Sequence, residues 1–102
     1  MVASLEAIQK QQMLGMYGPL FLLDSQSSRE AAMKRFQSGL ENQLKRLAAL
    51  PANQRYITTM MTRNHFQQLI DDFSNLDKDQ QKEAQGLYDY AKDQLASPLL
   101  KQ

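Results

Sequence analysis

Residues 27–49, SSREAAMKRFQSGLENQLKRLAA, decide the fold because their large apolar side chains recur at helical spacing. Ser27 and Glu30 have the spacing of a capping box, and Pro51 disfavours helical geometry in the residue before it. Five apolar side chains fall within about 60° of one another on a helical wheel: Met33, Phe36, Leu40, Leu44 and Leu47. We therefore expect a long helix over 27–49 that turns this side toward a core.

A second amphipathic helix is predicted over about 78–96. Asp77 is placed to cap it, with Gln80 three residues further on. Its apolar side includes Ala84 and Ala91, whose small side chains allow a neighbouring helix to approach closely. We expect this helix to pack antiparallel against the long helix.

The middle of the chain carries two apolar sets at helical spacing. The first set is Tyr56, Ile57, Met60 and Met61. The second lies on nearly the opposite side of a straight helix and is Phe66, Leu69, Ile70 and Phe73. One continuous helix would have to be buried all round, whereas a break would let two helices each bury one side. Because Asn64 and Gln67 repeat the spacing of a capping box, we expect the break and two helices, 52–62 and 65–74.

The remaining predicted helix covers about 4–16 and is stopped by Gly18 and Pro19. The whole pattern predicts an all-α fold, a small irregular bundle of four to five helices (about 4–16, 27–49, 52–62, 65–74 and 78–96). With 102 residues, 42% of them hydrophobic, the chain has the size of a single helical domain, 1–102.

The composition leaves little room for catalysis. The chain has no Cys and one His, which excludes thiolate zinc sites and a histidine cluster. His65 has no carboxylate nearer in sequence than Asp71, so a helix-start histidine is favoured over a proton carrier. The acidic pairs Asp71 with Asp72 and Asp77 with Asp79 do not form a calcium loop. We expect no catalytic residue, no metal site, no cofactor and no enzymatic activity.

The formal net charge is only +1, but the charges are unevenly distributed. Residues 27–63 carry seven Lys or Arg and two Asp or Glu. Residues 64–102 carry four Lys or Arg and seven Asp or Glu. Four cations project opposite the apolar side of the long helix and define a basic strip: Lys34, Arg35, Lys45 and Arg46. Arg55 and Arg63 would extend this strip along nucleic-acid phosphates or an acidic partner. The alternative is a solvated face in which Glu30 and Glu41 pair with the lysines four residues on.

The N-terminal third of the chain is more apolar than one short helix requires. Candidate protein-binding residues here are Met13, Met16, Tyr17, Leu20, Phe21 and Leu22. The alternative is that these residues cover one end of the bundle. Insertion into a membrane surface would require a basic flank, which this segment lacks. We expect a non-enzymatic protein–protein interaction module, such as an adaptor, antagonist or regulatory subunit, that self-associates through this third as a homo-oligomer. A nucleic-acid-associated regulator that uses the basic strip is the alternative.

The sequence also bears on location. Glu6 and Lys10 interrupt the place where the apolar run of a secretory signal would lie. The most apolar stretch, residues 14–23, is about half of the roughly 20 residues that cross a bilayer and contains Gly and Pro. We expect a cytoplasmic protein with no membrane span.

Overall fold

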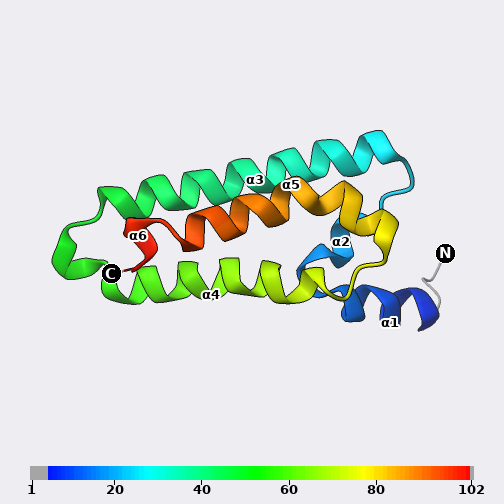
Figure 1. Ribbon diagram of the computed structural model, residues 1–102, viewed down its shortest axis with the longest axis horizontal. Helices are drawn as coiled ribbons and strands as arrows, with labels where there is room; N and C mark the ends of the chain where they lie inside the picture. The colour runs from blue at the N-terminus through cyan, green and yellow to red at the C-terminus, as the bar shows by residue number, and fades with distance from the viewer. Residues whose placement is uncertain (1–4, 102) are drawn as a thin grey trace.

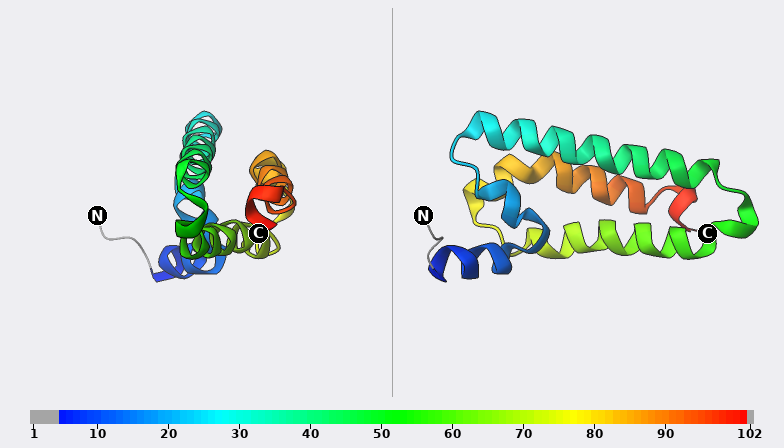
Figure 2. Two further views of the ribbon diagram at one scale, coloured as in Figure 1. Left: turned by 90° about the vertical axis from the view of Figure 1, so that its left-hand side faces the viewer. Right: turned by 180° about the vertical axis from the view of Figure 1, so that it is seen from behind.

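A computed structural model describes residues 5–101. The secondary structure within that range consists of α and 3-10 helices, with no strand. Three long helices lie side by side along a body of 48 × 23 × 22 Å: α3 (Gln26–Ala49), α4 (Tyr56–Phe73) and α5 (Lys78–Leu95) (Figure 1). Seen down the long axis, they occupy three corners, with α4 below α3 and α5 (Figure 2). The all-α bundle expected from the sequence is confirmed.

Four of the five predicted core residues of α3 are buried, and Phe36 is half-buried. They meet the buried side of α4, centred on Phe66 and Leu69, and the alanines of α5, Ala84 and Ala91, which are fully buried. Helix α5 runs antiparallel to α4 and in the same direction as α3 (Figure 1). The expectation that α5 packs antiparallel against α3 is wrong, because the short connection after Phe73 folds α5 directly back onto α4.

The helix caps follow local side-chain chemistry. The N-terminus of α3 is capped by Ser25, whose Oγ accepts a hydrogen bond from the Ser28 N–H at 3.1 Å. The capping box predicted at Ser27 and Glu30 is therefore wrong by two residues. In α5 the predicted capping box is confirmed: the Gln80 N–H donates to Asp77 Oδ1 at 2.8 Å, and the Asp77 N–H donates to Gln80 Oε1 at 3.0 Å.

Helix α4 is continuous, so the predicted break into 52–62 and 65–74 is wrong. Thr62 is fully buried within it, and its hydroxyl donates to the Thr58 carbonyl at 2.8 Å. Asn64 is an exposed residue in the middle of the helix rather than a cap. The break was expected because both apolar sets were assumed to be buried. The structure buries only the second set.

The chain before α4 forms a 3-10 turn, η2 (Ala52–Gln54), so the helix begins at Tyr56 instead of following Pro51 directly. After α5, a short helix α6 (Pro98–Lys101) turns back and buries Leu100. This end of the bundle therefore contains the C-terminus of α3, η2, the N-terminus of α4 and α6 (Figure 1).

The opposite end is closed by α1 (Leu5–Leu14), the 3-10 turn η1 (Gly15–Tyr17) and α2 (Gly18–Phe21). The single helix predicted over 4–16 is wrong at its C-terminal end, and Ser4 lies outside the described residues. Gly15 ends α1 with a φ of 58°, and a Cβ atom there would collide with the carboxylate of Asp72. Pro19 does not stop a helix but lies in the first turn of α2.

Candidate interaction surfaces

The first apolar set of α4 forms an exposed surface. Its exposed fractions are 74% for Tyr56, 69% for Ile57, 66% for Met61 and 45% for Met60. All four belong to the first two turns of one helix, and we call them the α4 face. Aromatic and methionine side chains are enriched at protein–protein interfaces, where they supply contact area and adaptable packing. Sequence reasoning assigned this set to a core, although two apolar sets on opposite sides of one helix also fit one buried side and one binding side.

The position of the α4 face is fixed by Arg55, which precedes it. The Arg55 side chain donates from Nε to the Leu50 carbonyl at 2.7 Å and from Nη2 to the Ala48 carbonyl at 2.9 Å. These are carbonyl groups at the C-terminus of α3, which have no partners within that helix. Arg55 thus ties the start of α4 to the end of α3. The guanidinium predicted to contact nucleic acid or an acidic partner is engaged within the chain.

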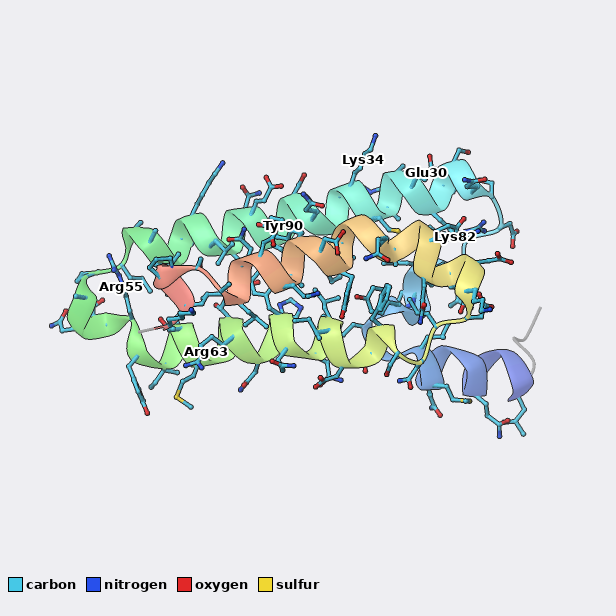
Figure 3. All side chains as sticks on the ribbon, in the orientation of Figure 1. Glu30, Lys34, Arg55, Arg63, Lys82 and Tyr90 are labelled. Atoms are coloured by element: carbon cyan, nitrogen blue, oxygen red, sulfur yellow. The ribbon has the colours of Figure 1, made fainter. Side chains whose placement is uncertain are left out.

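An exposed cation, Arg63, lies at the edge of the α4 face. Residues 42–70 contain four Lys or Arg and no Asp or Glu. Of these cations, Lys45, Arg46 and Arg63 are exposed. Arg63 lies with Met60 and Leu95 at the edge of a hollow of about 290 Å³. Figure 3 shows Arg55 and Arg63 toward the same end of the bundle.

The N-terminal segment is largely part of the core. Tyr17 and Leu20 are buried, and Met16 and Phe21 are half-buried. The Tyr17 hydroxyl donates to the Leu69 carbonyl at 2.7 Å, and the ring packs edge-on to Phe73. Burial, and then the negative charge of Asp72, raises the pKa of the Tyr17 phenol above its ordinary range. Tyr17 and Leu20 therefore have no surface for a partner, and they close the end of the bundle instead.

A second contact holds this segment in place. The Met16 N–H donates to Asp72 Oδ2 at 2.9 Å, and Gln68 Nε2 donates to the other carboxylate oxygen of Asp72 at 2.8 Å. Of the six predicted protein-binding residues, Met13 and Leu22 remain exposed, at 70% and 52%. For these two, a role in binding stays a prediction.

Near Met13 and Leu22 the exposed charge is negative. Residues 71–80 contain four Asp and one Lys, and all four Asp except the buried Asp72 are exposed. Asp24, which follows directly after Leu23, is exposed as well. Asp77 borders two hollows, one of about 270 Å³ with Met13 and Leu14 and one of about 410 Å³ with Phe21, Asp79 and Lys82. We call this surface the acidic end, and it comprises Met13, Leu22, Leu23, Asp24, Asp77 and Asp79.

The basic strip projects from α3 as predicted, since its four side chains are all exposed. Lys34 points away from the bundle (Figure 3). The pairs that the alternative of a solvated face required, between Glu30 or Glu41 and the lysines four residues on, do not form. Glu30 accepts a hydrogen bond from Gln26 at 3.1 Å, and Glu41 accepts one from Gln37 at 3.2 Å. Among the side chains that the structure describes, the only ion pair joins Arg29 to Glu83, at 2.9 Å, and it links α3 to α5.

His65 lies on the side of α4 that faces α3. It is half-buried, its Nδ1 is 3.3 Å from Gln43 Oε1, and its ring meets Phe36 edge-on. Burial lowers the pKa of His65. Within residues 5–101 no three His, Cys, Asp or Glu side chains gather as metal ligands. The contacts of His65 are those of a packed helix–helix interface.

No family model matches the chain, and neither a curated protein nor a solved structure is significantly similar to it. None of the helices within residues 5–101 has both the length and the apolar character to cross a membrane.

Proposed function

We propose that this chain is a cytoplasmic, non-enzymatic protein–protein interaction module, an adaptor, antagonist or regulatory subunit, that binds through the α4 face. The observation that carries the proposal is the exposure of Tyr56, Ile57, Met60 and Met61 on a helix whose other side is fully engaged in the core. These four side chains expose roughly 500 Å², which is in the range of the largest apolar patch of a typical monomer and is often functional.

The α4 face also has the rigidity that a binding site needs. Its backbone belongs to a continuous helix that is clamped by Arg55 at one end and packed on Phe66 and Leu69 beyond it. A partner that binds here therefore orders few backbone dihedrals on binding, which reduces the entropic cost of association. The N-terminal third offers a partner less apolar surface, because Tyr17 and Leu20 are already buried.

Site-specific photo-crosslinking tests the proposal. A photoreactive residue placed at Met61 is expected to give a discrete protein adduct in native extract, because this exposed side chain belongs to the surface that a partner covers. The control is the same residue at Ser38, which is exposed on the outer side of α3. Equal labelling at Ser38 and Met61, or no adduct at Met61, contradicts the proposal.

A nucleic-acid-associated regulator is the second candidate, and the basic strip favours it. Glu30 and Glu41 accept hydrogen bonds from glutamines, so Lys34 and Lys45 are not neutralised by the carboxylates four residues before them. Binding of non-specific DNA or RNA that weakens steeply with salt, and that is lost in Arg35→Glu with Arg46→Glu, supports this candidate. Binding that is insensitive to the double substitution excludes the strip.

A further inference from the structure

We propose that the partner of the α4 face is the acidic end of a second copy of this chain, so that the protein associates head to tail. This inference rests on the proposed function, since it names the occupant of the same surface. Three observations carry it: opposite charge around two exposed apolar surfaces, their separation along the molecule, and the area that they would bury together.

The charges at the two surfaces are complementary. Beside the α4 face, Arg63 is exposed and shares a hollow with Met60, and residues 42–70 carry no carboxylate. At the acidic end, Asp24, Asp77 and Asp79 are exposed, and Asp77 shares a hollow with Met13. Apolar side chains on each surface can therefore meet while exposed cations of one copy approach exposed carboxylates of the other.

The same charges disfavour a symmetric pair. If two α4 faces met, the exposed Arg63 side chains of both copies would enter the same interface, with no carboxylate from residues 42–70 to compensate. Like charges brought together at an interface oppose association and select against that arrangement. The contact between unlike surfaces has no such penalty.

The shape of the acidic end suits a side chain from outside. Asp77 stands between a hollow of about 270 Å³ beside Met13 and a hollow of about 410 Å³ beside Phe21 and Asp79. Each hollow has an apolar side chain and a carboxylate on its wall. The larger one is also lined by Lys82 and by Arg29, which is paired with Glu83. An apolar anchor of the α4 face fits such a hollow with Arg63 near its acidic rim.

The area fits a weak, reversible contact. The α4 face exposes roughly 500 Å² and the three apolar side chains of the acidic end roughly 300 Å², so that together they bury about 800 Å². This value is below that of a standard-size interface and is typical of transient association.

The two surfaces lie toward opposite ends of a body 48 Å long (Figure 1). One pair of copies therefore leaves one α4 face and one acidic end free. Such a contact is heterologous, and it continues into a ring or an open chain of copies.

Complementation between two variants tests the inference. The first variant, Ile57→Asp with Met61→Asp, removes the α4 face. The second, Leu22→Lys with Asp79→Lys, alters the acidic end and leaves the helix-capping Asp77 intact. A matched control, Ser38→Asp with Asn42→Asp, adds the same charge as the first variant at exposed positions of α3. Circular dichroism and urea unfolding establish that each variant retains the fold.

Sedimentation is then measured up to about 200 µM, where an interface of this size is populated. We expect the wild type and the control to form species larger than a dimer, and each variant alone to weaken association by about 100-fold. A one-to-one mixture of the two variants is expected to form a heterodimer and stop there. Association of the second variant alone through the α4 face, or no heterodimer in the mixture, overturns the inference.

A wild type that remains monomeric also overturns it. In that case, a discrete adduct of another protein at Met61 leaves the proposed interaction module standing, so the two failures are distinguishable.

Discussion

Removal of the Tyr17 hydroxyl tests whether the N-terminal segment is part of the core. In Tyr17→Phe the ring and its edge contact with Phe73 are kept, while the 2.7 Å hydrogen bond to the Leu69 carbonyl is lost. The Leu69 carbonyl lies within α4, so it still accepts the backbone hydrogen bond of the helix when the hydroxyl is removed. The expected loss is therefore that of one hydrogen bond, about 1 kcal/mol in the free energy of unfolding.

Urea unfolding measures this loss, and thermal unfolding is expected to show a Tm lower by about 4–8 °C for a domain of this size. The matched control is Tyr56→Phe, which removes a hydroxyl from a side chain that is 74% exposed. This control is expected to change the free energy of unfolding by less than about 0.5 kcal/mol. Equal effects of the two substitutions would refute the placement of Tyr17 in the core.

The pH dependence provides a second readout for the same residue. Burial and the charge of Asp72 raise the pKa of Tyr17 in the folded state above that of an unfolded tyrosine, about 10. The contribution of Tyr17 is therefore fully present below about pH 10 and is lost as the pH rises further. We expect the wild type to lose stability above about pH 10 more steeply than Tyr17→Phe. Parallel curves would contradict the burial of the phenol.

Three other predictions test the rest of the fold. Asn64→Ala is expected to raise the free energy of unfolding in urea by about 0.5 kcal/mol, because Ala is the better residue inside a helix. A loss of stability would indicate that α4 is broken at Asn64. Gly15→Ala is expected to cost more than about 1 kcal/mol, since the φ of 58° disfavours any Cβ, and a neutral result in the same assay would contradict the turn. Because burial lowers the pKa of His65, its contribution to stability is present above about pH 6.5 and is lost as the pH falls through the folded pKa. Thermal unfolding of His65→Gln is expected to show a weaker decline in acid than the wild type, and an unchanged profile would place His65 in solvent.

The parts of the fold that depend on local chemistry could be predicted from the sequence. The apolar side of α3 and the cap formed by Asp77 and Gln80 involve residues within a few positions of one another, so spacing alone identifies them. The same reasoning placed the cap of α3 at Ser27 instead of Ser25, because several serines in succession satisfy the same local rule.

The contacts that join distant residues could not be predicted. Asp72 accepts a hydrogen bond from the Met16 N–H, and the Tyr17 hydroxyl donates one to the Leu69 carbonyl. Each of these contacts joins residues more than fifty positions apart. No spacing rule connects such pairs, so the burial of Tyr17 was only one of two alternatives. The exposure of the α4 face was missed for a related reason: periodicity shows that side chains share a side of a helix, but the tertiary packing decides whether that side is covered.

Disulfide trapping tests the head-to-tail contact between the α4 face and the acidic end most directly, because the chain contains no cysteine of its own. Two single-cysteine variants, Met61→Cys and Leu22→Cys, place one thiol on each surface, at side chains exposed by 66% and 52%. The two are mixed in equal amounts, oxidised, and separated by mass. The head-to-tail contact predicts that the disulfide between positions 61 and 22 exceeds each homodimeric product by much more than the twofold excess that random pairing of equal amounts gives. A statistical mixture, or a predominance of the 61-to-61 product, would contradict it.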